Sequence, residues 1–129
     1  MTLAPLLLDH FKSPRNVGRI ESPTGRGRAT NEACGDALEI EVRIASGRVE
    51  ASGFLAQGCS AVIACASYAT EKAKGLAVAA ALALDVDLLL AEVGEASAVR
   101  RHGMTLAIRA LREAIERGAR EIGRSPPVR

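Results

Sequence analysis

The stretch ALEIEVRIASGRVEASGFLA, residues 37–56, decides the fold because it contains two strand patterns joined by a tight turn. In its first half apolar residues alternate with charged ones, which is the period of a strand with one buried face. Ala45-Ser46-Gly47 supplies a hairpin turn, and Arg48 to Ala56 is predicted to be the antiparallel return strand. Such a hairpin brings its far ends together, so the residues before Leu38 and after Ala56 should lie side by side.

The chain before the hairpin has a less regular pattern. Residues 3–12 are predicted to form a short helix that ends at the SPRN turn around Pro14. Residues 13–33 are rich in Gly, Pro, Ser, Thr and Arg, which is typical of a long loop. Within that loop we expect one short edge strand near Arg28 to Thr30.

Helical patterns with clear end signals follow the hairpin. They are predicted over residues 61–74, 76–83 and 86–92, with Ser60 as the cap of the first and Asp85 as the cap of the third. The final helix is amphipathic; its apolar stripe is Met104, Ile108, Leu111 and Ile115, and its water-facing residues are Arg109, Arg112, Glu113, Glu116 and Arg117. Strands come first and helices after, so we expect an α+β fold, a small antiparallel sheet of about three strands packed against helices.

Composition excludes several classes of function. At 129 residues the chain can bury a core as one domain, expected over residues 1–129. A net charge of +2 and only three aromatic residues argue against nucleic-acid binding. The longest charge-free run, GLAVAAALAL, is well short of the roughly 20 residues that a membrane span needs. An odd cysteine count and the lack of a secretory leader predict a cytoplasmic protein with reduced thiols.

The stretch NEACGD, residues 31–36, places a thiol and a carboxylate two positions apart in front of the first hairpin strand. Gly35 lets the backbone bend so that Cys34 and Asp36 can point at one spot. The alternative is a turn with a buried thiol and an Asp that bonds its own backbone. Cys59 lies where the return strand ends and a helix begins, so hairpin geometry should bring it to Cys34. A helix N-terminus also favours a thiolate. Two thiols and a carboxylate at one end of the sheet predict a metal site.

A histidine is available to complete the set. His102 precedes the final helix in Arg101-His102-Gly103, where a surface or capping role is the alternative. Four ligands, Cys34, Asp36, Cys59 and His102, would suit zinc or iron. Cys65 shares a helix face with small apolar residues and is predicted to be buried packing. His10 is predicted to be a helix-end residue favoured by the helix dipole.

Four blocks in order resemble the IscU/NifU-type scaffold proteins, on which iron–sulfur clusters are assembled. They are DHFKSPRNVG at 9–18, NEACGD at 31–36, GCSAVIACASYATE at 58–71 and RRHGMTLAIRALREAI at 100–115. Because the blocks span almost the whole length, the chain is identified as a member of this family.

The resemblance implies a carrier rather than an enzyme. Cysteines at the positions of Cys34 and Cys59, with a third, would hold a labile [2Fe-2S] cluster, iron or a zinc ion, and Asp36 and His102 would be alternative ligands. A cysteine desulfurase would supply sulfur, an iron donor would supply iron, and the finished cluster would pass to apo iron–sulfur proteins. A hard carboxylate beside soft thiolates holds the site less tightly than a further thiolate, which suits transfer.

Two departures from the family pattern leave alternatives open. The family normally has His-Cys where this chain has His102-Gly103, and the missing thiol is usually a ligand and an acceptor of sulfur. The family's Leu-Pro-Pro-Val-Lys motif falls at residues 96–100, which read ASAVR, so release by a dedicated Hsp70-type chaperone is not expected. A second hypothesis is therefore a degenerate scaffold, a zinc-binding or metal-free interaction or regulatory partner of a desulfurase. A third makes Cys59 a sulfurtransferase nucleophile.

Overall fold

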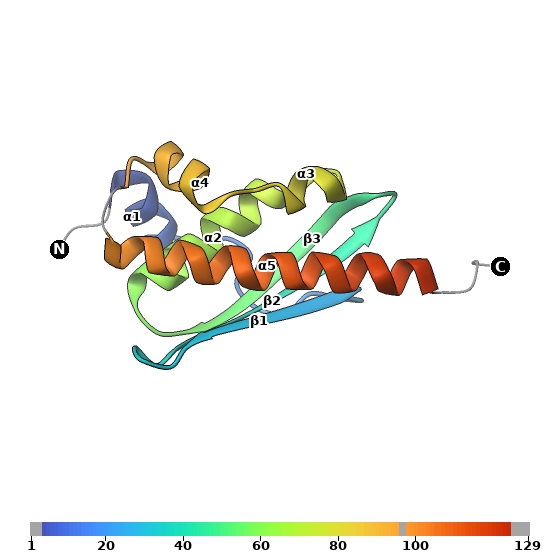
Figure 1. The fold of residues 1–129 in the computed structure, drawn as a ribbon, viewed down its shortest axis with the longest axis horizontal. Coiled ribbons are helices and arrows are strands. Elements are labelled where there is room, and N and C mark those ends of the chain that lie inside the picture. The colour runs from blue at the N-terminus through green and yellow to red at the C-terminus, as the bar shows by residue number, and fades with distance from the viewer. Residues whose placement is uncertain (1–3, 96–97, 125–129) are drawn as a thin grey trace.

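The computed structural model describes residues 4–95 and 98–124. A three-stranded sheet lies against helices, and the long last helix runs along the sheet (Figure 1). The elements are α1 (Pro5–Lys12), β1 (Gly25–Asn31), β2 (Asp36–Ala45), β3 (Arg48–Gln57), α2 (Ser60–Ala73), α3 (Val78–Leu82), α4 (Val86–Val93) and α5 (Ala98–Arg124). The predicted α+β class and the helix–strand order are confirmed.

The sheet is antiparallel throughout, in the order β1-β2-β3. Leu38 lies opposite Ala56 and Ile40 opposite Phe54, so the predicted hairpin has formed, with a register shift between Arg43 and Ile44. The apolar face of β2 is buried, as predicted. Helices α2 and α5 cover that face of the sheet (Figure 1). Within the described parts of the chain, no helix is long and apolar enough to cross a membrane.

Strand β1 is a full strand, longer than the short edge strand predicted near Arg28 to Thr30. Its glycines allow α5 to pack directly on its backbone. A Cβ on Gly27 would lie 2.0 Å from the carbonyl oxygen of Ala110, and one on Gly25 would lie 2.0 Å from that of Ala114. The composition that indicated a loop therefore serves a close helix–strand contact.

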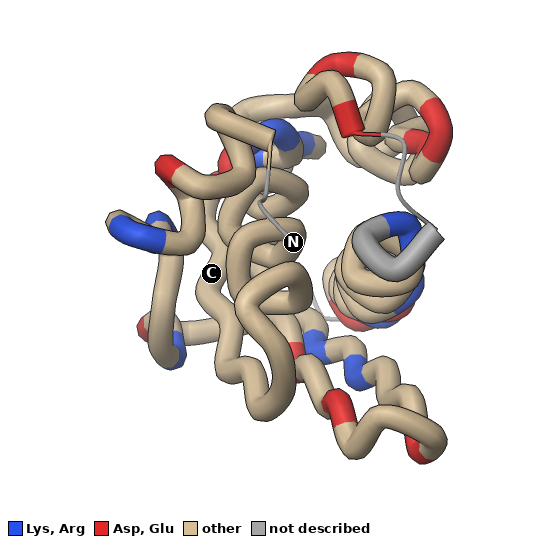
Figure 2. Tube along the Cα trace, turned by 90° about the vertical axis from the view of Figure 1, so that its left-hand side faces the viewer, with Lys and Arg blue, Asp and Glu red and all other residues tan. Residues whose placement is uncertain are grey.

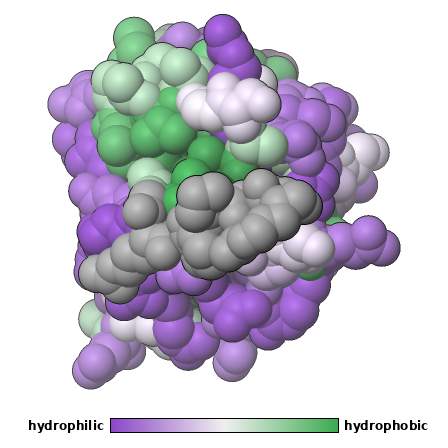
Figure 3. Space-filling view, turned by 90° about the vertical axis from the view of Figure 1, so that its right-hand side faces the viewer, coloured by the Kyte–Doolittle hydropathy of each residue, from purple (hydrophilic) through white to green (hydrophobic). Residues whose placement is uncertain are grey.

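The helix predicted over 76–83 is shorter than expected because its first residues extend along β3. The Gly75 N–H donates to the Val49 carbonyl at 2.7 Å, and the Val49 N–H donates to the Leu76 carbonyl at 2.9 Å. Ala77 then bridges Arg48. Helix α3 begins only at Val78. On the face that Figure 3 shows, apolar side chains gather in the upper part, with hydrophilic residues around them.

The face of β2 away from the helices carries a buried carboxylate. Glu41 lies on this face but is only 3 % exposed because the segment before β1 crosses over it. Arg19 and Arg26 donate to its Oε2, and the Ile20 N–H donates to Oε1 at 3.1 Å. Burial alone would raise the pKa of Glu41, but hydrogen bonds from Arg26, Ile20 and Arg19 outweigh it and hold this pKa below its ordinary value.

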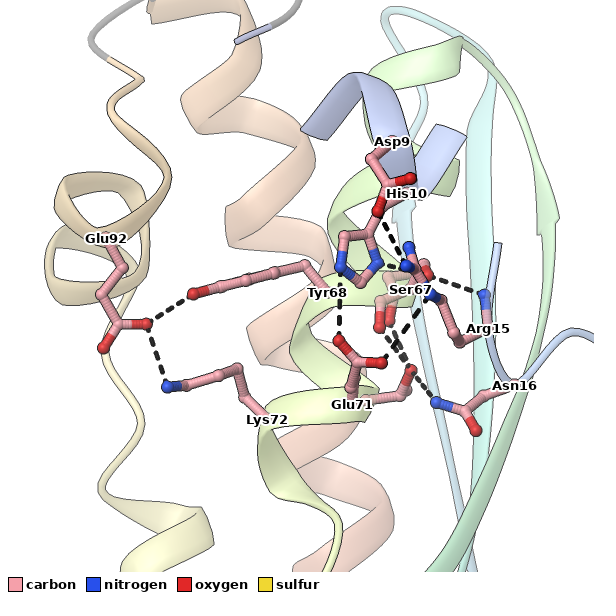
Figure 4. Close-up of polar contacts among 11 residues, drawn as sticks. Asp9, His10, Arg15, Asn16, Ser67, Tyr68, Glu71, Lys72 and Glu92 are labelled. Atoms are coloured by element: carbon pink, nitrogen blue, oxygen red, sulfur yellow. Dashed lines mark hydrogen bonds and ion pairs between the residues drawn. The ribbon is translucent and has the colours of Figure 1, made fainter. Parts of the chain in front are cut away.

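The prediction that His10 is a simple helix-end residue is wrong, because the side chain is buried between α1 and α2 (Figure 4). Its Nδ1 lies 2.7 Å from Oγ of Ser67, and its Nε2 lies 3.4 Å from Oε1 of Glu71. The Ser67 hydroxyl oxygen also accepts the backbone N–H of Arg15, so the hydroxyl is free to donate to Nδ1. The imidazole packs edge-on against Tyr68, with ring centroids 5.4 Å apart. Burial, then the charge of Arg15, lowers the pKa of His10.

Candidate metal centre

The candidate ligands lie at one end of the molecule, where β1 turns into β2 and β3 leads into α2 (Figure 1). Figure 2 faces this end, with the β1–β2 turn below the start of α5. Cys34 is exposed in the turn, and Cys59 is exposed at the N-cap of α2. Asp36 is the first residue of β2, and His102 is exposed on α5. The predicted arrangement differs in one detail, because His102 lies inside the final helix rather than before it.

Asp36 and Cys59 are in direct contact. The Cys59 N–H donates to Oδ1 of Asp36 at 3.2 Å, and this carboxylate is only 6 % exposed. Gly58 makes the contact possible: its φ is +149°, and an added Cβ would lie 2.1 Å from the same Oδ1. Hairpin geometry has therefore brought the start of β2 against the residues that follow β3, as the sequence predicted.

Cys34 occupies a tight turn that presents its thiol to solvent. The Cys34 N–H donates to the Asn31 carbonyl at 3.2 Å, and the Gly35 N–H donates to the Glu32 carbonyl at 3.4 Å. Gly35 has a φ of +71°, the left-handed conformation expected of a glycine here. The alternative of a buried thiol does not describe this turn, because Cys34 is exposed and the Asp36 carboxylate bonds Cys59.

Asn31 connects His102 to the strand ends, a role that the sequence did not indicate. Its side-chain amide nitrogen contacts Nε2 of His102, and its Oδ1 accepts the N–H of Ala33 at 3.2 Å. Asn31 is also the β1 residue paired with Asp36. Asn31 is the first residue of NEACGD, and this was the only sign in the sequence that it could belong to the site. Its contact with His102 depends on how α5 crosses β1.

The four candidate ligands do not form a closed metal site in this conformation. Among residues 4–95 and 98–124, no three His, Cys, Asp or Glu side chains converge in a way that could hold a metal ion. The Cys59 N–H engages Oδ1 of Asp36 and the Asn31 side chain engages Nε2 of His102, so each of these two atoms would have to exchange a hydrogen-bond partner for a metal ion. The ligand set Cys34, Asp36, Cys59 and His102 therefore stays a prediction.

Gly103 faces the first turn of α2. An added Cβ would lie 3.1 Å from the carbonyl carbon and oxygen of Ala61 and 3.3 Å from the Val62 nitrogen. The position where the resemblance places a cysteine thus lies beside the helix that Cys59 caps. Part of the segment compared with the chaperone motif, Ala96 and Ser97, lies outside the described residues.

Cys65 does not replace the missing thiol. Its side chain is fully buried, and burial raises its pKa to about 12, so it stays protonated at neutral pH. The prediction that Cys65 is core packing agrees with this position.

Comparison with known proteins supports one family across the chain. The model of the NifU-like N terminal domain family matches residues 4–122. The iron-sulfur cluster assembly scaffold protein IscU 1 of Archaeoglobus fulgidus is 40% identical over 109 residues, covering 84% of this chain and 71% of that protein. The IscU scaffold protein of Haemophilus influenzae is 33% identical over 119 residues, covering 89% and 94%. The crystal structure of a NifU-like protein (N-terminal) from Brucella abortus shares the fold, with a TM-score of 0.70 at 16% identity over 90% of this chain and 93% of that one.

Proposed function

The chain belongs to the NifU-like N terminal domain family, and on that premise we propose that it is a scaffold for iron–sulfur cluster assembly. It binds iron or a [2Fe-2S] cluster transiently through Cys34, Asp36, Cys59 and His102. The observation that carries the proposal is the Asp36–Cys59 contact at the sheet end, with the exposed Cys34 thiol in the adjoining turn.

The geometry suits a cargo that must leave again. Both candidate thiol ligands are exposed, so a cluster on them would be reachable by another protein. Asp36 can alternate between the Cys59 N–H and a metal ion, and a hard carboxylate beside soft thiolates holds the site less tightly than a further thiolate would. Cys59 is the N-cap of α2, and the N-terminus of that helix stabilises the negative charge of the Cys59 thiolate.

Partners follow from the same proposal. A cysteine desulfurase delivers sulfur, an iron donor delivers iron, and apo iron–sulfur proteins receive the product. The names of the relatives from Archaeoglobus fulgidus and Haemophilus influenzae, which describe assembly scaffolds, support this role.

Anaerobic reconstitution with Fe²⁺ and sulfide tests the proposal. We expect a visible cluster chromophore that Cys34→Ser and Cys59→Ser each weaken, because each removes a soft ligand. Cys65→Ala is the matched control: it removes a buried thiol and should leave the chromophore unchanged in the folded fraction. A colourless protein that retains neither iron nor sulfide would contradict the proposal.

A second candidate function follows from Gly103. With one thiol fewer than the family pattern, the chain could bind zinc, or no metal, and act as an interaction or regulatory partner of a desulfurase. Elemental analysis of the purified protein for iron, sulfide and zinc separates the two functions. Desulfurase binding in a pull-down, together with failed cluster assembly, would favour the second.

A further inference from the structure

A hollow of about 400 Å³ opens beside the candidate metal centre, between the end of β1 and the first half of α5. Helix α5 contributes His102, Thr105 and Arg109 to it, and the chain at the end of β1 contributes Asn31 and Glu32. The hollow is within the size range of small-molecule sites, roughly 300–1,000 Å³. His102, which lines the hollow, is also a candidate ligand of the metal.

Two opposite charges line the hollow without pairing. Neither the Arg109 guanidinium nor the Glu32 carboxylate has a hydrogen bond or an ion pair with any residue that the structure describes. One comes from the helix and the other from the turn after β1. A free cation and a free anion in one small hollow fit a zwitterion, whose carboxylate would bind the guanidinium and whose ammonium would bind Glu32. A phosphate would fit less well, because Glu32 would repel it.

The metal centre next to this hollow has one thiolate ligand fewer than the family pattern. Gly103 follows His102 directly and offers no thiolate, and Cys65 is buried. Iron held by Cys34 and Cys59 would have to complete its coordination with oxygen or nitrogen donors, or with a sulfur from outside the chain.

We propose that the hollow binds a small α-amino-acid thiol of the cysteine class, whose sulfur supplies the thiolate that Gly103 does not. The carboxylate of this molecule lies on Arg109 and its ammonium on Glu32, with Thr105 as a further hydrogen-bonding group. As the sulfur–iron bond forms, the thiol proton goes to solvent and an oxygen ligand leaves the iron; no electrons are transferred. This inference rests on the proposed scaffold function.

Titration of the metal-free protein tests the hollow itself. Under anaerobic conditions with a phosphine reductant, L-cysteine should shift the amide NMR signals of residues 30–32 and 102–109. Cysteamine, which lacks the carboxylate, should bind about tenfold more weakly, and Arg109→Gln should weaken L-cysteine by a similar factor. Arg120→Gln is the matched control, since Arg120 is exposed on the same helix and lines a different hollow. Equal binding by Arg109→Gln and the unmodified protein, or absence of shifts, would overturn the inference.

Reconstitution with Fe²⁺ and sulfide, first without any small thiol, tests the metal step. Adding L-cysteine should lengthen cluster lifetime in the unmodified protein and in Arg120→Gln, but not in Arg109→Gln, and L-serine should have no effect. A cluster equally stable with and without L-cysteine, or equally stabilised by cysteamine, refutes the inference and leaves the proposed function standing. If no cluster forms under any condition, the proposed function fails, and the inferred metal step fails with it; the titration still shows whether the hollow binds the zwitterion.

Discussion

Replacing Gly103 by cysteine tests whether this position faces the metal centre. The added Cβ would contact the Ala61 carbonyl group at 3.1 Å and the Val62 nitrogen at 3.3 Å, so the first turn of α2 must shift by a few tenths of an ångström. Overpacking of this kind costs about 1–3 kcal/mol, and a mild clash belongs at the lower end. Loss of an internal helix glycine returns about 0.3 kcal/mol. We expect the free energy of unfolding to fall by about 1 kcal/mol.

The serine variant separates the steric effect from the chemical one. Gly103→Ser should lose about as much stability as Gly103→Cys, because the two side chains are similar in size. Only the cysteine variant should hold iron more tightly, with loss to a chelator slowed by about tenfold, equivalent to about 1.4 kcal/mol. Urea unfolding measures the first effect, and the decay of the cluster chromophore under chelator measures the second. Equal cluster lifetimes in the two variants would show that residue 103 does not reach the metal, and the placement of the site would be wrong.

Three further predictions concern the framework around the site. Gly27→Val should lower the free energy of unfolding by about 3 kcal/mol or more, because its Cβ would lie 2.0 Å from the Ala110 oxygen. Arg28 is an exposed neighbour, and Arg28→Ala should change this free energy by less than about 0.5 kcal/mol in the same urea titration. Glu41→Gln should cost about 1–3 kcal/mol, because it weakens charged hydrogen bonds at a buried site, and a smaller loss would show that the arginines re-pair. His10 should make the protein less stable below about pH 6.5, the ordinary pKa of histidine, because burial lowers the pKa of His10 in the folded state and the unfolded state then binds more protons. His10→Asn should flatten this part of the curve of stability against pH. An unchanged slope would show that His10 does not cause the pH dependence.

Features specified by local sequence were predictable. The β2–β3 hairpin follows from strict alternation and a two-residue turn, and Asp85 caps α4 by accepting the Leu88 N–H at 3.2 Å. The Asp36–Cys59 contact was also within reach, because it needs only the antiparallel return of one hairpin.

Features that depend on distant packing were not predictable from one sequence. β1 has no apolar alternation, and its glycines have a purpose only when α5 is in place. The burial of Glu41 depends on a loop crossing the sheet, and that of His10 on the docking of α1 against α2. The Asn31–His102 contact likewise joins two elements far apart in the chain. For Glu41 and His10 the local pattern is compatible with exposure, and only the tertiary fold removes the side chain from water.

The glycine contact between β1 and α5 has a consequence for how the protein tolerates change. Main chain rests on main chain there, with no flexible side chain between them to absorb a shift. A shift of β1 against α5 is therefore passed directly to the helix that carries His102. A single-residue insertion within 25–27 or 110–118 should thus disturb metal handling where β1 turns into β2, whereas one in the hairpin turn at 46–47 should not.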